Sequence, residues 1–384
     1  MQSQGAYQMS MTRRSVLKGA AAAVAAPAIL RAHDALASSG AVNVFAWQDY
    51  VQPNIAEKFT ADTGITLNLT TYGSNDEAAS TLVANGGKGF DVIMPSITNR
   101  AQYESPDAPD GIFLSPIDET KANLDAVIPS FLRDSVQLGA TKDGARYLIP
   151  LDWGTEGITL NRGALDIADA DISYGDMWRP EAAGAAAFRQ KSGIVGVGLY
   201  LDATGEVPSN RMLDVYKSEE DARRVWSAVT QWMLERKGNF GAFWNNATEA
   251  TAAFKEAGCT IGQTWDTTGL LLNREDPNYV FRAPKEGIIT WLDSIGVPSG
   301  VDNVDQAYAF INFMLTPEVG GMFANNTGYN SAVAGAADYA SEEFKRQFNE
   351  VYREDVLNNM WWWQADQPFT SAVTNEFVEI ITNA

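Results

Sequence analysis

An alternation of strand and helix patterns over residues 41–96 limits the fold of this chain more than any other feature. Residues 41–47 form an apolar run typical of a buried strand, and residues 65–73 alternate apolar and polar side chains. Residues 51–64 lie between them and carry helix signals, a proline near the start and a glycine at the end. A second helix pattern, 75–89, precedes a third apolar run, 90–96. The sequence therefore predicts an α/β fold with a mainly parallel sheet flanked by helices.

The carboxyl ends of these strands are the expected place for a ligand, because open parallel sheets bind ligands beyond that edge. The first strand ends in Trp47 and is followed by Asp49 and Tyr50. The second and third strands end in the segments 71–74 and 95–98.

Length and charge narrow the class of protein. The chain has 384 residues, more than one hydrophobic core usually holds, so two domains are expected. The formal net charge of −20 argues against nucleic acid as a partner, since phosphates require a basic face. The same charge suits a protein that handles cations.

The first 37 residues have the pattern of a secretory signal. Arg13 and Arg14 stand before the apolar stretch 19–30, and the small residues Ala35 and Ala37 mark a cleavage site. The paired arginines resemble a twin-arginine signal, which exports folded proteins to the periplasm. The alternative, an amphipathic first helix, is disfavoured because alanine and glycine fill every face. Met9 or Met11 is an alternative start. Removing residues 1–37, whose net charge is +3, leaves a chain of −20 − 3 = −23.

The composition excludes several kinds of catalytic site. The single histidine, His33, lies in the signal segment, and Cys259 is the single cysteine. Serine–histidine and cysteine–histidine nucleophile systems, histidine zinc sites and disulfides within the mature chain are therefore excluded. Residues 85–90 and 196–201 contain glycines but match neither a P-loop nor a dinucleotide fingerprint. We expect no cofactor and no metal; a carboxylate-pair hydrolase stays open.

The rest of the chain continues the alternation. Residues 144–162 resemble a strand interrupted by Pro150 and Gly154, and residues 222–238 form an amphipathic helix pattern. Residues 258–266 and 289–298 are predicted strands. Residues 303–332 predict a helix, a turn marked by proline, a second helix and a Gly-Tyr loop.

Several predicted strand ends combine an aromatic residue with a carboxylate. These pairs are Trp47 with Asp49, Asp152 with Trp153, Trp265 with Asp266, and Trp291 with Asp293, and the tail adds Trp361, Trp362 and Trp363 beside Gln364. Each tryptophan alone is explained by core packing. Because Trp291 and Asp293 alternate in a strand, they share one face. An indole face and a carboxylate both attract positive charge, so the repeated combination indicates a site for a cation.

Six segments, in their order and spacing, resemble the periplasmic spermidine/putrescine-binding proteins of ABC importers. They are "VNVFAWQDYVQPNIAEKFTADTGI", "FDVIMPS", "YLIPLDWGTEGITLN", "IGQTWD", "APKEGIITWLDSIGVP" and "INFMLTPEV" with "TGYNSA". The resemblance implies a two-lobed periplasmic binding protein fold of the class II type, which closes on its ligand through crossover strands. It places the first lobe at 41–147 and 294–337, and the second at 148–293 and 338–384.

The resemblance also supplies candidate ligand residues. They are Trp47, Asp49, Tyr50 and Ser96 for the first lobe, Trp265, Trp291 and Asp293 for the second lobe and hinge, and Gln364 for the tail. Further candidates of the aromatic or acidic type are Trp153, Glu156, Asp202, Glu206, Asp266, Tyr329 and Trp363. In the family, the aspartate equivalent to Asp293 meets an amine, and the tryptophans pack on its methylene chain.

The sequence departs from the family at four places. One is the run of three tryptophans at 361–363, which is unusual in the family. Thr98 stands where the family often has an aromatic residue, and Glu156 where it has a small or neutral one. Asp202 and Glu206 are one residue further apart than the family's acidic pair. A compact ammonium, held in an aromatic cage, is therefore as tenable as a long diamine.

The function expected from these observations is capture of a cationic amine and its delivery to a membrane permease. The expected partners are a small cationic ligand and an ABC permease, and the chain is expected to be a monomer without enzymatic activity. The alternatives are a binding protein for a sugar or another neutral solute, and a secreted carboxylate-pair hydrolase.

Overall fold

The computed structural model describes residues 9, 11–12 and 40–384, and these residues form two compact units. The N-terminal unit contains residues up to Trp153 and Trp291–Arg346. The C-terminal unit contains Gly154–Thr290 and Gln347–Ala384. The chain passes between the units inside strand β7 (Leu148–Asn161), strand β12 (Ile289–Pro298) and helix α13 (Glu342–Val351). The expected signal segment, with Arg13, Arg14 and the Ala37 site, lies outside the described residues.

The observed divisions differ from the boundaries expected at 147/148, 293/294 and 337/338. They fall at 153/154, 290/291 and 346/347. The second difference changes the assignment of Trp291 and Asp293, because the structure groups both with the N-terminal unit and not with the second lobe.

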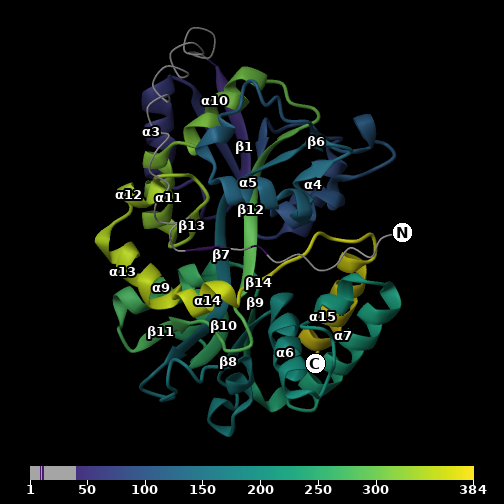
Figure 1. Ribbon diagram of the computed structural model, residues 1–384, viewed down its shortest axis with the longest axis vertical. Coiled ribbons are helices and arrows are strands. Elements are labelled where there is room, and N and C mark those ends of the chain that lie inside the picture. The colour runs from purple at the N-terminus through teal and green to yellow at the C-terminus, as the bar shows by residue number, and fades with distance from the viewer. Residues whose placement is uncertain (1–8, 10, 13–39) are drawn as a thin grey trace. The chain divides into compact units, whose positions relative to one another are not determined.

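The N-terminal unit is built on a sheet in the order β2-β1-β3-β12. Strand β1 (Ala41–Trp47) pairs in parallel with β2 (Thr66–Tyr72) along its whole length, and with β3 (Val92–Ile93) on its other side. Strand β12 is antiparallel to β3 and to β4 (Leu114–Ser115). Helices α3 (Pro53–Thr63) and α4 (Asn75–Ala84) make the connections β1-α3-β2-α4-β3, so the strand–helix alternation predicted for residues 41–96 is confirmed (Figure 1).

Local sequence explains the ends of these two helices. Pro53 is the first residue of α3, where a missing backbone N–H costs nothing, and Gly64 ends the helix in the left-handed conformation with φ 73°. The Ser74 side chain accepts a hydrogen bond from the backbone N–H of Glu77 and caps α4. The predicted third strand, 90–96, is reduced to Val92–Ile93, because the chain turns there into a 3-10 helix at Ile97–Tyr103.

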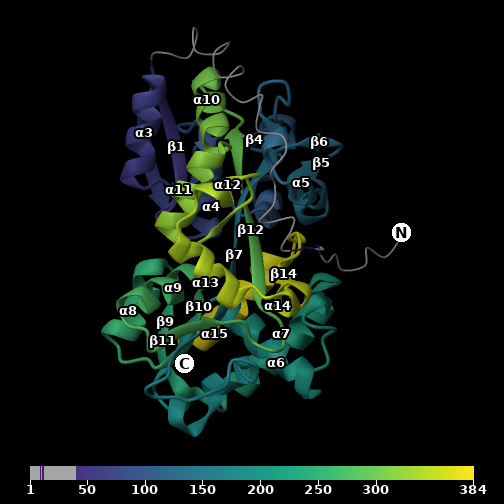
Figure 2. The same cartoon turned by 60° about the vertical axis from the view of Figure 1, so that its left-hand side comes forward.

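Helices α10 (Val304–Met314) and α11 (Pro317–Thr327) complete the core of the N-terminal unit and pack with α3 (Figure 2). The Phe59 ring of α3 lies 5.2 Å from the rings of both Phe310 and Phe313. The predicted helix–turn–helix is confirmed, with Pro317 starting α11 and Gly328 ending it. The unit also contains α5 (Pro129–Asp134), β5 (Thr141–Lys142), β6 (Ala145–Arg146), β13 (Asn330–Ser331) and α12 (Ala336–Tyr339).

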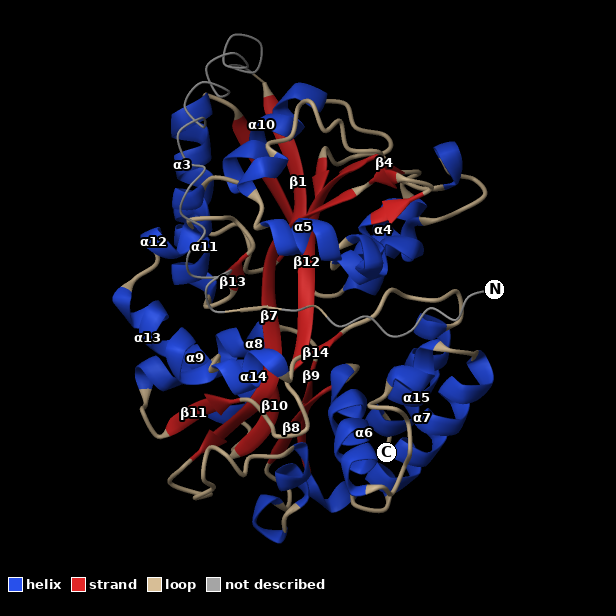
Figure 3. Ribbon diagram, in the orientation of Figure 1, coloured by secondary structure: helices blue, strands red, loops and turns tan. Residues whose placement is uncertain are grey.

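The C-terminal unit has a mixed sheet in the order β7-β10-β8-β9 (Figure 3). Strand β8 (Ala186–Arg189) pairs in parallel with β9 (Phe240–Trp244) on one side and with β10 (Ile261–Trp265) on the other. Strand β7 is antiparallel to β10 and to β11 (Tyr279–Arg282). Its helices are α6 (Ser192–Thr204), α7 (Glu219–Leu234), α8 (Ala247–Lys255), α9 (Asp266–Glu275), α14 (Glu354–Asn358) and α15 (Thr370–Thr382), and β14 (Trp361–Trp362) pairs with β12 at residues 289–290.

Strand β7 and Cys259 bear on two of the sequence predictions. The strand expected to be interrupted at Pro150 and Gly154 is continuous, since a proline is tolerated in a strand where its nitrogen need not donate. Cys259 is buried, and burial raises the pKa of its thiol to about 11, as expected of a structural cysteine. Among the described residues, no helix combines the length and apolar character needed to cross a bilayer.

Candidate functional site

The carboxyl end of β1 positions the first candidate residues of the N-terminal unit. Trp47 is the last residue of β1, and the turn that follows is closed by a hydrogen bond of 3.2 Å from the N–H of Tyr50 to the carbonyl of Trp47. The Tyr50 hydroxyl donates to Oδ2 of Asp293 over 2.6 Å. The structure therefore brings together two candidates that are 243 residues apart in sequence.

Strand β12 supplies Trp291 and Asp293, which are 8% and 3% exposed. The Trp291 ring is perpendicular to the ring of Tyr329, with the centroids 4.9 Å apart. Asp293 forms an isolated antiparallel bridge with Ser96, whose hydroxyl accepts a hydrogen bond of 2.9 Å from Asn75. Asp293, Trp291, Ser96 and Tyr329 are thus held by neighbours within one unit.

Asp49 combines a raised carboxyl pKa with a carboxylate oxygen that has no hydrogen-bond partner in the described part of the chain. Its side chain accepts a hydrogen bond from Tyr329, yet burial raises the pKa of the carboxyl above its ordinary value. Its Oδ2 is buried and has no hydrogen-bond partner among the described residues. The indole Nε1 of Trp291 is likewise buried and has no acceptor in the described part of the chain. The unit therefore contains a buried carboxylate oxygen and a buried indole donor that have no hydrogen-bond partner among the described residues.

The electrostatics of this region are set by carboxylates among tyrosines. Burial raises the pKa of Tyr50 well above its ordinary value, and the negative charges of Asp152 and Asp293 raise it further. Burial raises the pKa of Tyr72 as well, with Asp293, Asp152 and Asp49 as further contributors. Both phenols therefore stay protonated near neutral pH. Trp153, beside Asp152, is fully buried, with its ring 6.2 Å from Phe131, and serves the core.

The candidates of the C-terminal unit include a buried ion pair. Glu156, in β7, is fully buried, and its Oε1 accepts from Nη1 of Arg189 over 2.5 Å. Its Oε2 accepts from the Ser192 hydroxyl and, over 3.3 Å, from Nε2 of Gln263. The guanidinium carbon of Arg189 lies 4.5 Å from the ring centroid of Trp265, a cation–π distance.

Asp266 begins α9 and is fully buried. It accepts hydrogen bonds from the Tyr352 hydroxyl over 2.6 Å and from the backbone N–H groups of Thr155 and Thr267 over 3.1 and 3.0 Å. Burial raises the pKa of this carboxyl to about 7, against the lowering effect of these donors. The structure thus makes Asp266 the acceptor that joins Thr155, Thr267 and Tyr352 within the C-terminal unit.

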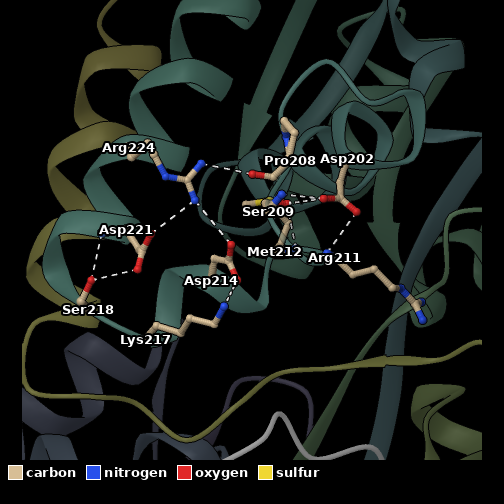
Figure 4. A network of polar contacts seen from close by, with 10 residues as sticks. All are labelled: Asp202, Pro208, Ser209, Arg211, Met212, Asp214, Lys217, Ser218, Asp221 and Arg224. Atoms are coloured by element: carbon tan, nitrogen blue, oxygen red, sulfur yellow. Dashed lines mark hydrogen bonds and ion pairs between the residues drawn. The ribbon is translucent and has the colours of Figure 1, made fainter. Parts of the chain in front are cut away.

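Asp202, in α6, has partners in the connection between α6 and α7 (Figure 4), and Glu206, in that connection, has a partner in α7. Oδ1 of Asp202 accepts from the N–H and hydroxyl of Ser209, and its Oδ2 from the N–H of Arg211. Glu206 is exposed and accepts from the indole N–H of Trp232 over 3.0 Å. Both carboxylates therefore hold this connection together.

The aromatic tail is joined to the C-terminal unit by its backbone and rings. The Trp361 indole N–H donates to the carbonyl of Arg211 over 2.6 Å, and Trp363 lies edge-on to Trp361 with the centroids 5.4 Å apart. The side-chain amide of Gln364 donates to the carbonyl of Trp362 over 2.7 Å. This contact gives Gln364 a local partner.

A family model for bacterial extracellular solute-binding proteins matches residues 54–349, which is more than half of the chain. The chain belongs to this family. A relative of this solute-binding protein, the spermidine/putrescine-binding periplasmic protein of Escherichia coli, is 25% identical over 336 residues, which are 87% of this chain and 89% of the relative. The putrescine-binding periplasmic protein SpuD of Pseudomonas aeruginosa is 26% identical and covers 85% and 87%.

Solved structures share the fold of this solute-binding protein. A putative spermidine/putrescine ABC transporter protein from Listeria monocytogenes aligns with a TM-score of 0.69 at 22% identity, covering 89% of this chain and 98% of the other. A binding protein from Agrobacterium tumefaciens in complex with glucopine aligns with a TM-score of 0.68 at 14% identity, covering 88% and 99%. At these identities the likeness establishes the two-lobed binding-protein fold and nothing about the ligand.

Sequence reasoning missed Arg189, which forms an ion pair with Glu156 and lies over the ring of Trp265 in this solute-binding protein. Arg189 ends β8, a strand that the sequence analysis did not identify. A basic residue at the carboxyl end of an apolar run, in a strongly acidic chain, was the available signal. Its partner Glu156 lies 33 residues away, so only the pairing of the strands could show the contact.

Proposed function

We propose that this solute-binding protein captures a cationic amine and delivers it to an ABC permease in the inner membrane. The observation that carries the proposal is the group formed by Asp49, Tyr50, Trp291 and Asp293 in the N-terminal unit. It combines two carboxylates and aromatic rings, the partners that an ammonium group requires.

The energetics of this group favour a cation over a neutral solute. The Tyr50 hydrogen bond orients Asp293, and the buried Oδ2 of Asp49 is an acceptor that lacks a donor among the described residues. An ammonium group would supply both charge and donors, offsetting the desolvation of the carboxylates. A contact with the Trp291 face would add about 0.5 to 2 kcal/mol. The names of the relatives, spermidine/putrescine-binding and putrescine-binding proteins, support the same class of ligand.

The location belongs to the proposal as well. The relatives are named as periplasmic proteins, and residues 11–37 have the pattern of a twin-arginine signal. We therefore place the mature protein in the periplasm as a monomer, exported folded and starting near Ser38. An amine captured there would pass to the permease.

Titration calorimetry with putrescine, spermidine, choline and glucose tests the proposed ligand class. We expect at least one of the amines to bind and glucose to give no heat of binding. The Asp107→Ala variant is the control for the total charge, since it removes an exposed acidic side chain from the same unit outside the proposed site. It should bind each ligand as the unchanged protein does. Binding of glucose without binding of any amine would replace this proposal with a neutral-solute function.

A further inference from the structure

Two buried polar atoms of opposite kinds lie beside one tyrosine of the N-terminal unit. Oδ2 of Asp49 is an acceptor and Nε1 of Trp291 is a donor, and neither has a hydrogen-bond partner among the described residues. Asp49 accepts a hydrogen bond from the Tyr329 side chain, and the Trp291 ring is perpendicular to the Tyr329 ring with the centroids 4.9 Å apart. A molecule that satisfies both atoms must donate one hydrogen bond and accept another.

A plain ammonium group satisfies only one of these two atoms. Its N–H groups can donate to Oδ2 of Asp49, but it has no acceptor for the indole N–H of Trp291. The methylene groups of an amine have neither a donor nor an acceptor. An unsubstituted amine therefore leaves the N–H of Trp291 unsatisfied, and a buried donor without an acceptor weakens binding.

A buried indole N–H is not by itself the sign of a ligand. Nε1 of Trp178, in the C-terminal unit, also has no acceptor within the described chain. The Trp178 ring packs against apolar rings, with centroids 5.1 Å from Phe188 and 5.8 Å from Phe240. Trp291 differs because the tyrosine that it contacts also binds Asp49, whose own oxygen needs a donor.

We propose that this protein selects amines that have a hydroxyl group beside the ammonium group over unsubstituted amines. The ammonium group donates to Oδ2 of Asp49, and the hydroxyl oxygen accepts from Nε1 of Trp291. This inference rests on the proposed function, in which Asp49 and Trp291 belong to the group that receives the amine. Asp49, Trp291 and Tyr329 all lie in the N-terminal unit.

The neighbouring charges favour an uncharged oxygen over a carboxylate. Asp293 lies two residues from Trp291 in β12, so the two side chains share one face of the strand. Asp49 supplies a second carboxylate beside Tyr329. An anionic group of a ligand would meet like charge here, whereas a hydroxyl group supplies an acceptor without negative charge.

Calorimetry with matched ligands tests the selectivity. The pairs are putrescine with 1,4-diamino-2-butanol and propylamine with 1-amino-2-propanol, and the members of each pair differ only in the hydroxyl group. In each pair that binds, the hydroxylated amine should bind at least about tenfold more tightly. Ornithine, which adds a carboxylate to putrescine, should bind more weakly than 1,4-diamino-2-butanol.

Three results of this titration overturn the inference and leave the capture of a cation standing. They are equal binding within the pairs, tighter binding of ornithine than of 1,4-diamino-2-butanol, and binding of choline alone, since choline has no N–H to donate to Asp49. If none of these amines binds, and spermidine does not bind either, the proposed function itself fails.

Two variants test which residue reads the hydroxyl group. Trp291→Phe keeps an aromatic face and removes the N–H, so it should lower the affinity for 1,4-diamino-2-butanol at least about tenfold more than the affinity for putrescine. Asp49→Asn removes the charge that both ligands meet, so it should weaken both and leave their ratio unchanged. A preference that survives Trp291→Phe and disappears in Asp49→Asn would mean that the hydroxyl group donates to Asp49, which overturns the inference.

Trp178→Phe is the matched control, because it removes the other buried indole N–H described above and lies in the C-terminal unit. The ratio of the two affinities should stay at the value of the unchanged protein. A ratio that changes equally in Trp178→Phe and Trp291→Phe contradicts the assignment to Trp291. The ligand pairs test the preference in the unchanged protein, so the inference can fail even if a variant does not fold.

Discussion

Trp291 and Asp293 show how two residues on one strand face become parts of a single receptor. Both are nearly buried, and each is fixed by a tyrosine, Trp291 by the ring of Tyr329 and Asp293 by the hydroxyl of Tyr50. A strand face exposed to water would show neither the burial nor these partners. The burial indicates that replacing either side chain will change what the N-terminal unit can hold.

Asp293→Asn should weaken amine binding by about 2 to 5 kcal/mol, as expected for the loss of one half of a buried charge pair. The substitution keeps the shape of the side chain, and Tyr50 can still donate to the amide oxygen. Trp291→Leu should cost less, about 1 to 3 kcal/mol, because apolar bulk remains and the π face is lost. Calorimetry with the tightest-binding amine measures both changes.

Asp107→Asn is the control for Asp293→Asn, since it removes the same charge at an exposed position of the N-terminal unit. Its dissociation constant should match that of the unchanged protein. An unaltered dissociation constant for a folded Asp293→Asn protein would show that this carboxylate does not receive the ammonium group.

At the scale of an element, helix α9 begins with a buried carboxyl that titrates near neutral pH. Burial raises the pKa of Asp266 to about 7 from an ordinary value of 3.8, while the Tyr352 hydroxyl favours the ionised form. A carboxyl with a raised folded-state pKa gives stability that is present below its unfolded pKa and is lost as the pH rises through the folded one. The contribution of Asp266 therefore falls between about pH 4 and pH 7.

Tyr352→Phe should make this loss larger. Removing the hydroxyl takes a hydrogen bond from the ionised carboxylate more than from the protonated acid, so the pKa of Asp266 should rise further. The free energy of unfolding should then drop by about 1 to 3 kcal/mol at pH 8 and by less at pH 5. Urea unfolding at both pH values measures the difference, and Tyr339→Phe, at an exposed tyrosine, is the control. An equal loss of unfolding free energy at both pH values would contradict the link between the Tyr352 hydroxyl and the ionisation of Asp266.

The elements also show which features sequence could predict. Strand β1 and helix α3 were predictable because their signals are local, an apolar run for the strand, and Pro53 at the start and Gly64 at the end of the helix. The role of Asp202 was not predictable, because it depends on a loop in which Asn210, Arg211 and Met212 all have positive φ. Such backbone conformations are costly, and Asp202 holds them through three hydrogen bonds.

The same contrast applies to the candidate site. The shared strand face of Trp291 and Asp293 follows from strand periodicity, and the structure places both side chains as buried neighbours of Tyr329 and Tyr50. The ion pair of Glu156 with Arg189 depends on tertiary structure, since the two residues lie in different strands. Periodicity identifies which side chains share a face, whereas it cannot show which charges have already been neutralised by each other.

At the scale of the whole molecule, the dominant property is the excess of acidic residues. The chain has 48 aspartates and glutamates against 28 lysines and arginines, a formal net charge of −20. A net negative protein attracts a cationic ligand over distances set by the ionic strength, which affects the rate of association more than the rate of dissociation. The net charge of the chain should therefore raise the association rate constant, while the site residues determine which ligand binds.

Stopped-flow tryptophan fluorescence with the tightest-binding amine tests this steering. Raising the ionic strength from about 0.01 M to about 0.15 M shortens the screening length from about 30 Å to about 8 Å. The association rate constant should fall by about tenfold, because long-range attraction is screened. The dissociation rate constant should change by less than about twofold, since the contacts with Asp293 and Trp291 are short and largely removed from water. The dissociation rate constant is the internal control. An association rate constant independent of salt would mean that the acidic excess has no part in capture, and a salt effect confined to dissociation would attribute it to screening within the site.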